Sequence, residues 1–202
     1  ERLCAALWPD AEGDAARNSF DNTLHRLRKL LGDEQRVQLL AGGLTLNTTT
    51  CHTDIAALGN CLTALDASRA DDDARIGDTL ALAHRGLALY RGDFLAGEDD
   101  MPDIIAARER IAARFARHMA DAGARLEQAG RASEAVAIYQ RVLELQPLAE
   151  DVCRHLIGCL ISLGRRAEAF ETYRRCRQQL SVLLSLRPAP ETEALVDPIR
   201  NL

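Results

Sequence analysis

The sequence predicts a mainly α-helical protein: an array of helical hairpins that follows a small N-terminal segment containing a β-hairpin. Three observations support this fold class. A sixteen-residue stretch recurs after 34 residues in the C-terminal half, apolar residues recur at helical spacing along most of the chain, and a glycine-rich turn joins two short apolar runs near residue 42. We therefore expect two domains, at residues 1–50 and 51–202.

The repeat pairs LEQAGRASEAVAIYQR, residues 126–141, with LISLGRRAEAFETYRR, residues 160–175, and seven of the sixteen positions are identical. Helical hairpins need a residue that tolerates positive φ where the first helix ends, and a small residue where the second helix approaches it. Large rings one turn later fill the space between hairpins. The repeat supplies all three types at matching positions: Gly130 and Gly164, Ala135 and Ala169, and Tyr139 and Tyr173.

The period and these residue types resemble the tetratricopeptide family. Met119 and Gly123 extend the resemblance into the first helix, and Pro147 ends the first repeat. The second repeat departs at Ile157 and Ser181, as a divergent terminal repeat would. The resemblance implies an array built to bind another macromolecule and not to catalyse a reaction.

Further helices are expected around the repeat, because such arrays need about three units to bury their apolar faces. Amphipathic patterns predict these helices at residues 54–65, 74–90 and 103–117, with a capping helix at residues 190–202. The inner surface of a tetratricopeptide array is lined by the first helix of each hairpin. We expect that surface to bind a peptide or helix of a partner through Arg117, Ala120, Ala124, Asp151, Arg154 and Gly158.

The first fifty residues predict a different unit. Residues 15–32 form an amphipathic helix that Gly32 ends, and residues 36–48 form a hairpin. After ERLCAALWPD, the strings LHRLRKLLG and LLAGGLTL resemble the recognition helix and wing of the OmpR-like winged-helix regulators, and we expect the chain to begin inside that domain. The resemblance implies that the helix enters the major groove. Its DNA-binding residues would be Arg17, Asn18, Asn22, Thr23, Arg26, Arg28 and Lys29, since Asn and Arg recognise base edges and cations meet phosphate.

The order of these parts is informative. The chain has a predicted winged helix, then LALYRGDFLAG at residues 87–97, then helical hairpins and a closing RPAPETEAL. This order resembles the bacterial transcriptional activator domain of the Streptomyces antibiotic regulatory protein family. Membership implies a DNA-binding transcription regulator whose helical domain mediates dimerisation, contacts RNA polymerase, or couples to a sensor domain. The alternative is a protein-interaction scaffold whose degenerate winged helix only packs and does not bind DNA.

Charge and motifs exclude several other functions. The net charge is −5, and residues 1–50 carry six basic and seven acidic side chains, so DNA binding must come from a local arrangement. Phosphate-binding glycine loops, GxSxG and HExxH are absent from the sequence, which indicates a protein that is not an enzyme. No membrane-spanning stretch or signal peptide is recognisable, which favours a cytoplasmic protein.

Four groups of polar residues could be considered as metal sites, but none has the ligand pattern of one, so no metal or cofactor is expected. His118 and Asp121 lie one helical turn apart, but a helix-surface hydrogen bond explains that spacing better. Cys51, His52 and Cys61 lack a second close ligand pair for zinc. The acidic runs at residues 71–73 and 98–103 suit helix N-termini. The six cysteines have no paired spacing and are interpreted as reduced core residues.

Overall fold

The computed structural model describes residues 2–40, 42–68, 75–98 and 101–200. Ala41 of the predicted turn, the acidic residues 71–73, and Asp99 and Asp100 lie outside the described residues. The chain divides into two compact units, Glu1–Ala56 and Ala57–Leu202. Within the part that the structure describes, every helix is too short or too polar to cross a lipid bilayer.

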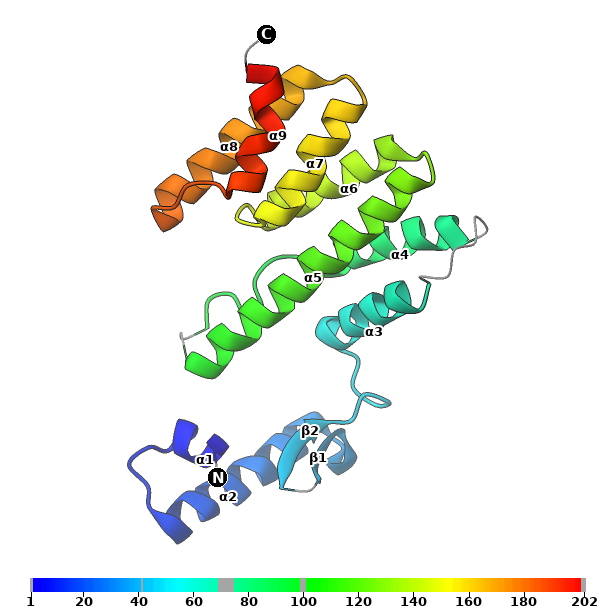
Figure 1. Ribbon diagram of the computed structural model, residues 1–202. Coiled ribbons are helices and arrows are strands. Elements are labelled where there is room, and N and C mark those ends of the chain that lie inside the picture. The colour runs from blue at the N-terminus through cyan, green and yellow to red at the C-terminus, as the bar shows by residue number, and fades with distance from the viewer. Residues whose placement is uncertain (1, 41, 69–74, 99–100, 201–202) are drawn as a thin grey trace. The chain divides into compact units, whose positions relative to one another are not determined.

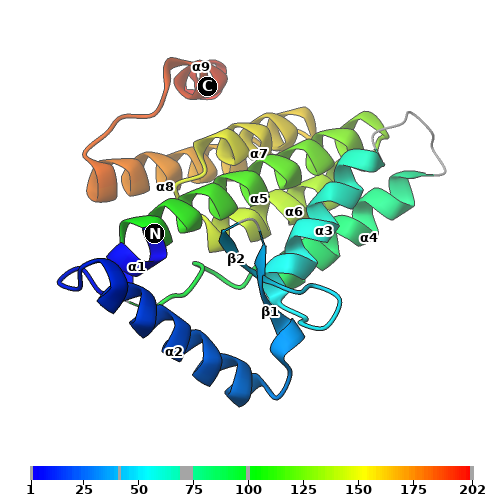
Figure 2. The same cartoon turned by 90° about the horizontal axis from the view of Figure 1, so that it is seen from below.

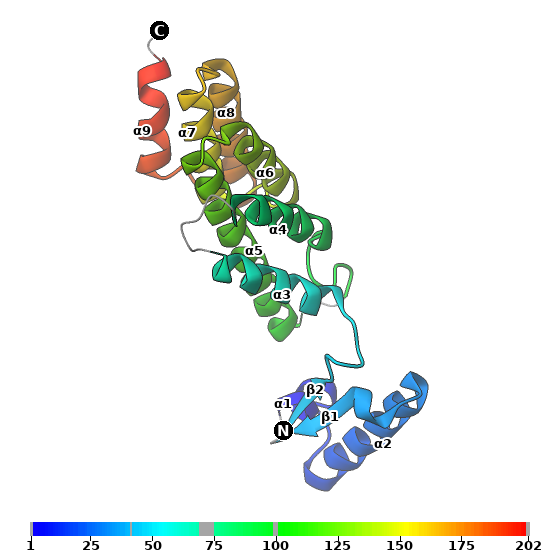
Figure 3. The ribbon, with the colours of Figure 1, turned by 90° about the vertical axis from the view of Figure 1, so that its right-hand side faces the viewer.

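The first unit contains two helices and a hairpin. Helix α1 (Arg2–Leu7) precedes α2 (Gly13–Leu31), and a short 3-10 turn (Glu34–Arg36) leads into β1 (Val37–Leu40) and β2 (Gly43–Leu46) (Figure 3). The strands are antiparallel, in a register that pairs Val37 with Leu46. Gly32 ends α2 in the left-handed conformation, with φ 73° and its N–H bonded to the Lys29 carbonyl.

The core of the first unit is small. Ala16 and Leu24 of α2 and Val37 of β1 are its buried apolar side chains among the described residues. Several leucines of the same unit remain largely exposed: Leu3, Leu7, Leu30, Leu39, Leu40 and Leu46. Little buried apolar area therefore stabilises this unit.

The second unit is the predicted array of helices. Its elements are α3 (Asp54–Ala67), α4 (Ile76–Leu89), α5 (Pro102–Gln128), α6 (Ala132–Leu145), α7 (Glu150–Ser162), α8 (Arg166–Leu184) and α9 (Pro190–Arg200) (Figure 1). Helices α5 and α6 form one hairpin and α7 and α8 the next. Helix α5 lies between α4 and α7, and α9 packs against α7 and α8 (Figure 2).

The repeat residues have the predicted roles. Gly130 and Gly164 end the first helix of each hairpin with φ of 75° and 74°, and Ala135 and Ala169 are fully buried. A Cβ on Gly123 would lie 2.3 Å from the ring of Tyr139, so only glycine allows this close packing. The mainly α, tetratricopeptide-like fold class, with a small β-hairpin near the N-terminus, is therefore confirmed.

Two helices differ from the expected segmentation. Residues 103–117 are not a separate helix but the first half of α5, which has 27 residues and Pro102 at its start. Nothing between the two halves breaks a helix, so one continuous helix forms. Helix α8 runs to Leu184, beyond the point where Pro147 stops the first repeat, because Ser181 occupies that position.

Candidate functional site

The outward face of α2 is polar and basic. Ala16 and Leu24 face the core of the first unit, two helical turns apart. Six of the seven residues predicted to bind DNA are exposed on this helix: Arg17, Asn18, Asn22, Thr23, Arg26 and Lys29. These side chains include amide donors and acceptors beside cations, the combination needed to read base edges and hold phosphates.

Arg28, the seventh predicted residue, is placed differently. Its Nε and Nη2 donate to the Val37 carbonyl oxygen at 3.1 and 3.0 Å, and the side chain is partly buried. Arg28 thus fastens α2 to the start of β1. The sequence carried a signal for this, since Arg28 follows the buried Leu24 by one helical turn and therefore points toward the core.

A groove lies between α5 and α7 in the second unit. Its volume is about 840 Å³, and it contains four of the six predicted partner-binding residues: Arg117, Ala120, Asp151 and Arg154. Ala124 and Gly158, further along the same helices, are not among the residues that line it. The structure therefore brings four of the six predicted residues together in one groove, and the partner-binding role of all six stays a prediction.

Small side chains of α5 and charged side chains of both helices are among the residues that line this groove. Ala112, Ala113 and Ala116 continue the alanine surface of α5, so a ligand backbone can approach closely. Arg154 forms an ion pair with Asp151 on α7. Glu150, which also lines the groove, accepts hydrogen bonds from the Ala189 amide and the Thr192 hydroxyl, both at 2.6 Å, and so holds the start of α9. These three alanines were not among the residues predicted to bind a partner.

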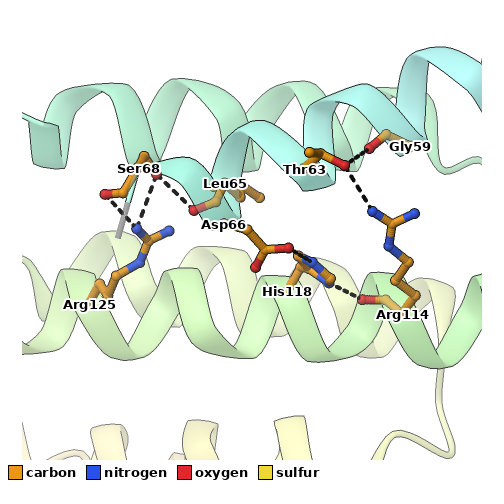
Figure 4. A network of polar contacts seen from close by, with 8 residues as sticks. All are labelled: Gly59, Thr63, Leu65, Asp66, Ser68, Arg114, His118 and Arg125. Atoms are coloured by element: carbon orange, nitrogen blue, oxygen red, sulfur yellow. Dashed lines mark hydrogen bonds and ion pairs between the residues drawn. The ribbon is translucent and has the colours of Figure 1, made fainter. Parts of the chain in front are cut away.

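A network of polar side chains joins α3 to α5 (Figure 4). His118 is buried, with Nδ1 2.7 Å from the Arg114 carbonyl oxygen and Nε2 2.9 Å from Asp66 Oδ2. Arg114 donates to the Thr63 hydroxyl, and Arg125 donates to both oxygens of Ser68. His118 on α5 therefore contacts Asp66 on α3 and helps to hold the two helices together. Among the described residues, no cluster of three or more His, Cys, Asp or Glu side chains could hold a metal ion.

The YRGDFL segment also has a packing role. Tyr90 is buried and stacks on Phe115 of α5, with ring centroids 4.1 Å apart, and Gln146 donates a hydrogen bond to its hydroxyl. Burial, reinforced by the charge of Asp93, raises the pKa of Tyr90 to about 12. Arg108 donates to the carbonyl oxygens of Phe94 and Leu95 at 2.7 and 2.6 Å, which fixes the loop that follows α4.

Comparison with known proteins agrees with this architecture. The family described as "Bacterial transcriptional activator domain" matches residues 54–200. The transcriptional regulator RedD of Streptomyces coelicolor is 25% identical over 199 residues, which cover 92% of this chain and 54% of RedD. The transcriptional regulatory protein EmbR of Mycobacterium tuberculosis is 28% identical over 214 residues, which cover 98% of this chain and 52% of EmbR.

A solved structure extends the comparison to the fold. Mycobacterium tuberculosis EmbR, determined in complex with a low affinity phosphopeptide, aligns with a TM-score of 0.69 and 23% identity over 98% of this chain and 53% of that one. The chain thus spans about half the length of the relatives that it matches. Both RedD and EmbR are described as transcriptional regulators. The match over residues 54–200 shows that this chain belongs to the bacterial transcriptional activator domain family.

Proposed function

We propose that this chain acts in transcription regulation by reading DNA with α2 and binding a protein partner in the groove between α5 and α7. One observation carries the DNA-reading part: Asn18, Asn22 and Arg26 all project from one exposed face of a helix whose other face is buried. A helix that only packed would not need this combination of amide and guanidinium groups on its outer side. The order α1, α2, hairpin supports the same proposal, because it is that of a winged helix-turn-helix.

The six exposed residues have separate roles in this proposal. Asn18, Asn22 and Arg26 hydrogen-bond to base edges, Thr23 contacts either base or sugar, and Arg17 and Lys29 contact phosphates. Arg28 positions α2 through its hydrogen bonds to Val37 and contacts DNA less than its neighbours do. The net charge of the chain contributes no attraction, so affinity depends on these local contacts.

A selection from duplexes of random sequence, followed by binding titrations at several salt concentrations, tests the DNA-reading role. Arg26→Ala should weaken binding to the selected duplex by about 1–3 kcal/mol and relax the preference at one base pair. Lys29→Ala should weaken binding to all duplexes and lower the salt slope by about 1. Arg177→Ala, on the exposed side of α8, is the matched control and should change neither the affinity for DNA nor its dependence on salt. If no sequence is enriched, or Arg26→Ala binds as the unmodified chain does, the chain is the alternative interaction scaffold.

The groove supplies the second half of the proposal. The alanines of α5 leave room for a helix or extended peptide, and the lining carries charges of both signs, so the ligand that we propose is a polypeptide segment with both basic and acidic side chains. Arg117 and Arg154 are the arginines that would contact its carboxylates. The solved relative EmbR holds a phosphopeptide, which supports a protein segment as the class of ligand. The segment would belong to RNA polymerase, to a sensor domain, or to a second copy of this chain.

Charge reversal in the groove tests this part. Arg117→Glu with Arg154→Glu should abolish binding to purified RNA polymerase holoenzyme or convert a dimer to a monomer in light scattering, depending on the occupant. Arg166→Glu, an exposed arginine on α8, is the control. If the double variant changes neither polymerase binding nor the oligomeric state, the groove is not the partner site.

A further inference from the structure

Two buried thiols meet between α7 and α8. Cys153 on α7 is 1% exposed and Cys176 on α8 is 5% exposed. The Cys153 sulfur lies 3.9 Å from the Thr172 carbonyl oxygen. In an α-helix that carbonyl accepts the N–H of the residue four positions later, so the Cys153 sulfur rests on the turn that carries Cys176. Cys153 and Cys176 therefore lie on facing turns of α7 and α8.

Cys176 has the chemistry and the access that a reactive thiol needs. The hydrogen bond from Cys153 holds the pKa of Cys176 below its ordinary value, although burial acts in the opposite direction, and the same hydrogen bond raises the pKa of Cys153. Cys176 also lines a groove of about 690 Å³ formed by α6, α7 and α8. The groove brings solvent, and with it a small oxidant, to the Cys176 side chain.

We propose that Cys153 and Cys176 form a dithiol that a peroxide oxidises to an intramolecular disulfide joining α7 to α8. The Cys176 thiolate attacks hydrogen peroxide, an S–O bond forms, the O–O bond breaks, and hydroxide leaves and takes up a proton to become water. The resulting sulfenic acid is attacked by Cys153, the S–S bond forms, and the second oxygen leaves as water. Two thiols are oxidised and one peroxide is reduced.

The disulfide would act where the partner groove is built. Cys153 lies on α7 between Val152 and Arg154, both of which line the groove between α5 and α7. A covalent link at Cys153 would fix this turn of α7 against α8. The oxidation itself follows from the thiol geometry and does not depend on the proposed function of the groove.

The experiment treats the folded, reduced chain with hydrogen peroxide, blocks the remaining thiols with an alkylating agent in denaturant, and maps the unreduced peptides by mass spectrometry. We expect the mass of two hydrogens to be lost, two of the six thiols to disappear, and the peptides of Cys153 and Cys176 to be linked. Cys153→Ser should leave a sulfenic acid at Cys176 that dimedone traps. Cys159→Ser, which removes another buried thiol, should behave as the unmodified chain does.

The peroxide treatment of the unmodified chain is enough to overturn the proposal, so the test does not depend on whether the cysteine variants fold. Retention of all six thiols under peroxide would contradict it. So would linkage of any other cysteine pair, or linkage of Cys153 to Cys176 that forms only after unfolding.

Discussion

Replacing Gly123 by alanine tests the tightest contact of the helical array. The added Cβ would lie 2.3 Å and 2.4 Å from Cε1 and Cζ of Tyr139, well inside van der Waals contact. The ring cannot move aside easily: it is fully buried, it stacks with the His155 ring at a centroid distance of 5.7 Å, and its hydroxyl donates to Glu127 at 2.6 Å.

The magnitude follows from two opposing effects. Overpacking of this severity costs about 3 kcal/mol, the upper part of the usual range. Alanine is favoured over glycine inside a helix by about 1 kcal/mol. The net loss of unfolding free energy for Gly123→Ala is therefore about 2 kcal/mol, which corresponds to a melting temperature lower by roughly 4–8 °C.

Gly158 provides a matched control, because it is also a glycine inside a first helix of a hairpin but has nothing within 4 Å of its Cβ position. Gly158→Ala should stabilise the chain by up to about 1 kcal/mol. Both variants are compared by urea unfolding and by calorimetry. Tyr139→Leu in the Gly123→Ala background should cost less than the sum of the two single changes, since the clash is relieved. A change of stability in the same direction for Gly123→Ala and Gly158→Ala would show that the contact between residue 123 and Tyr139 does not limit the packing.

The remaining predictions concern other packing positions in the second unit. Ala135→Leu should lower the unfolding free energy by about 1–3 kcal/mol in urea unfolding, because Ala135 is fully buried between α5 and α6; an unchanged midpoint would contradict that packing. His118→Leu should cost about 0.5–1.5 kcal/mol and speed hydrogen exchange in α3, since the hydrogen bond between His118 and the half-exposed Asp66 is lost, whereas unchanged exchange would show that the network does not hold α3. Folding raises the pKa of Tyr90 from 10 to about 12, so the neutral phenol stabilises the folded state below pH 10 and this stabilisation is lost between pH 10 and pH 12. Over that pH range Tyr90→Phe should lose less unfolding free energy than the unmodified chain does.

Much of the second unit could be predicted because its signals are local. A glycine that ends a helix, or a small residue opposite a ring, is recognisable within one 34-residue repeat, and Gly130 and Ala135 illustrate both. The continuity of α5 could have been found in the same way, by noting that no glycine or proline separates residues 103–117 from Met119.

The parts that the sequence did not predict depend on contacts between distant segments. Asp66 and His118 are 52 positions apart, and only the packing of α3 on α5 brings them together. The extent of the groove depends on how α5 and α7 cross, which excludes Ala124 and Gly158 from its lining. The hydrogen bonds of Arg28 to Val37 similarly required the position of β1 relative to α2.

Hydrogen–deuterium exchange of the chain, with and without its selected duplex, tests whether α2 reads DNA. If it does, the duplex should slow exchange along residues 17–29 of α2 and in the hairpin, and Asn22→Ala with Arg26→Ala should remove this protection. Protection confined to the second unit, or protection of α2 that survives both substitutions, would contradict DNA reading by α2.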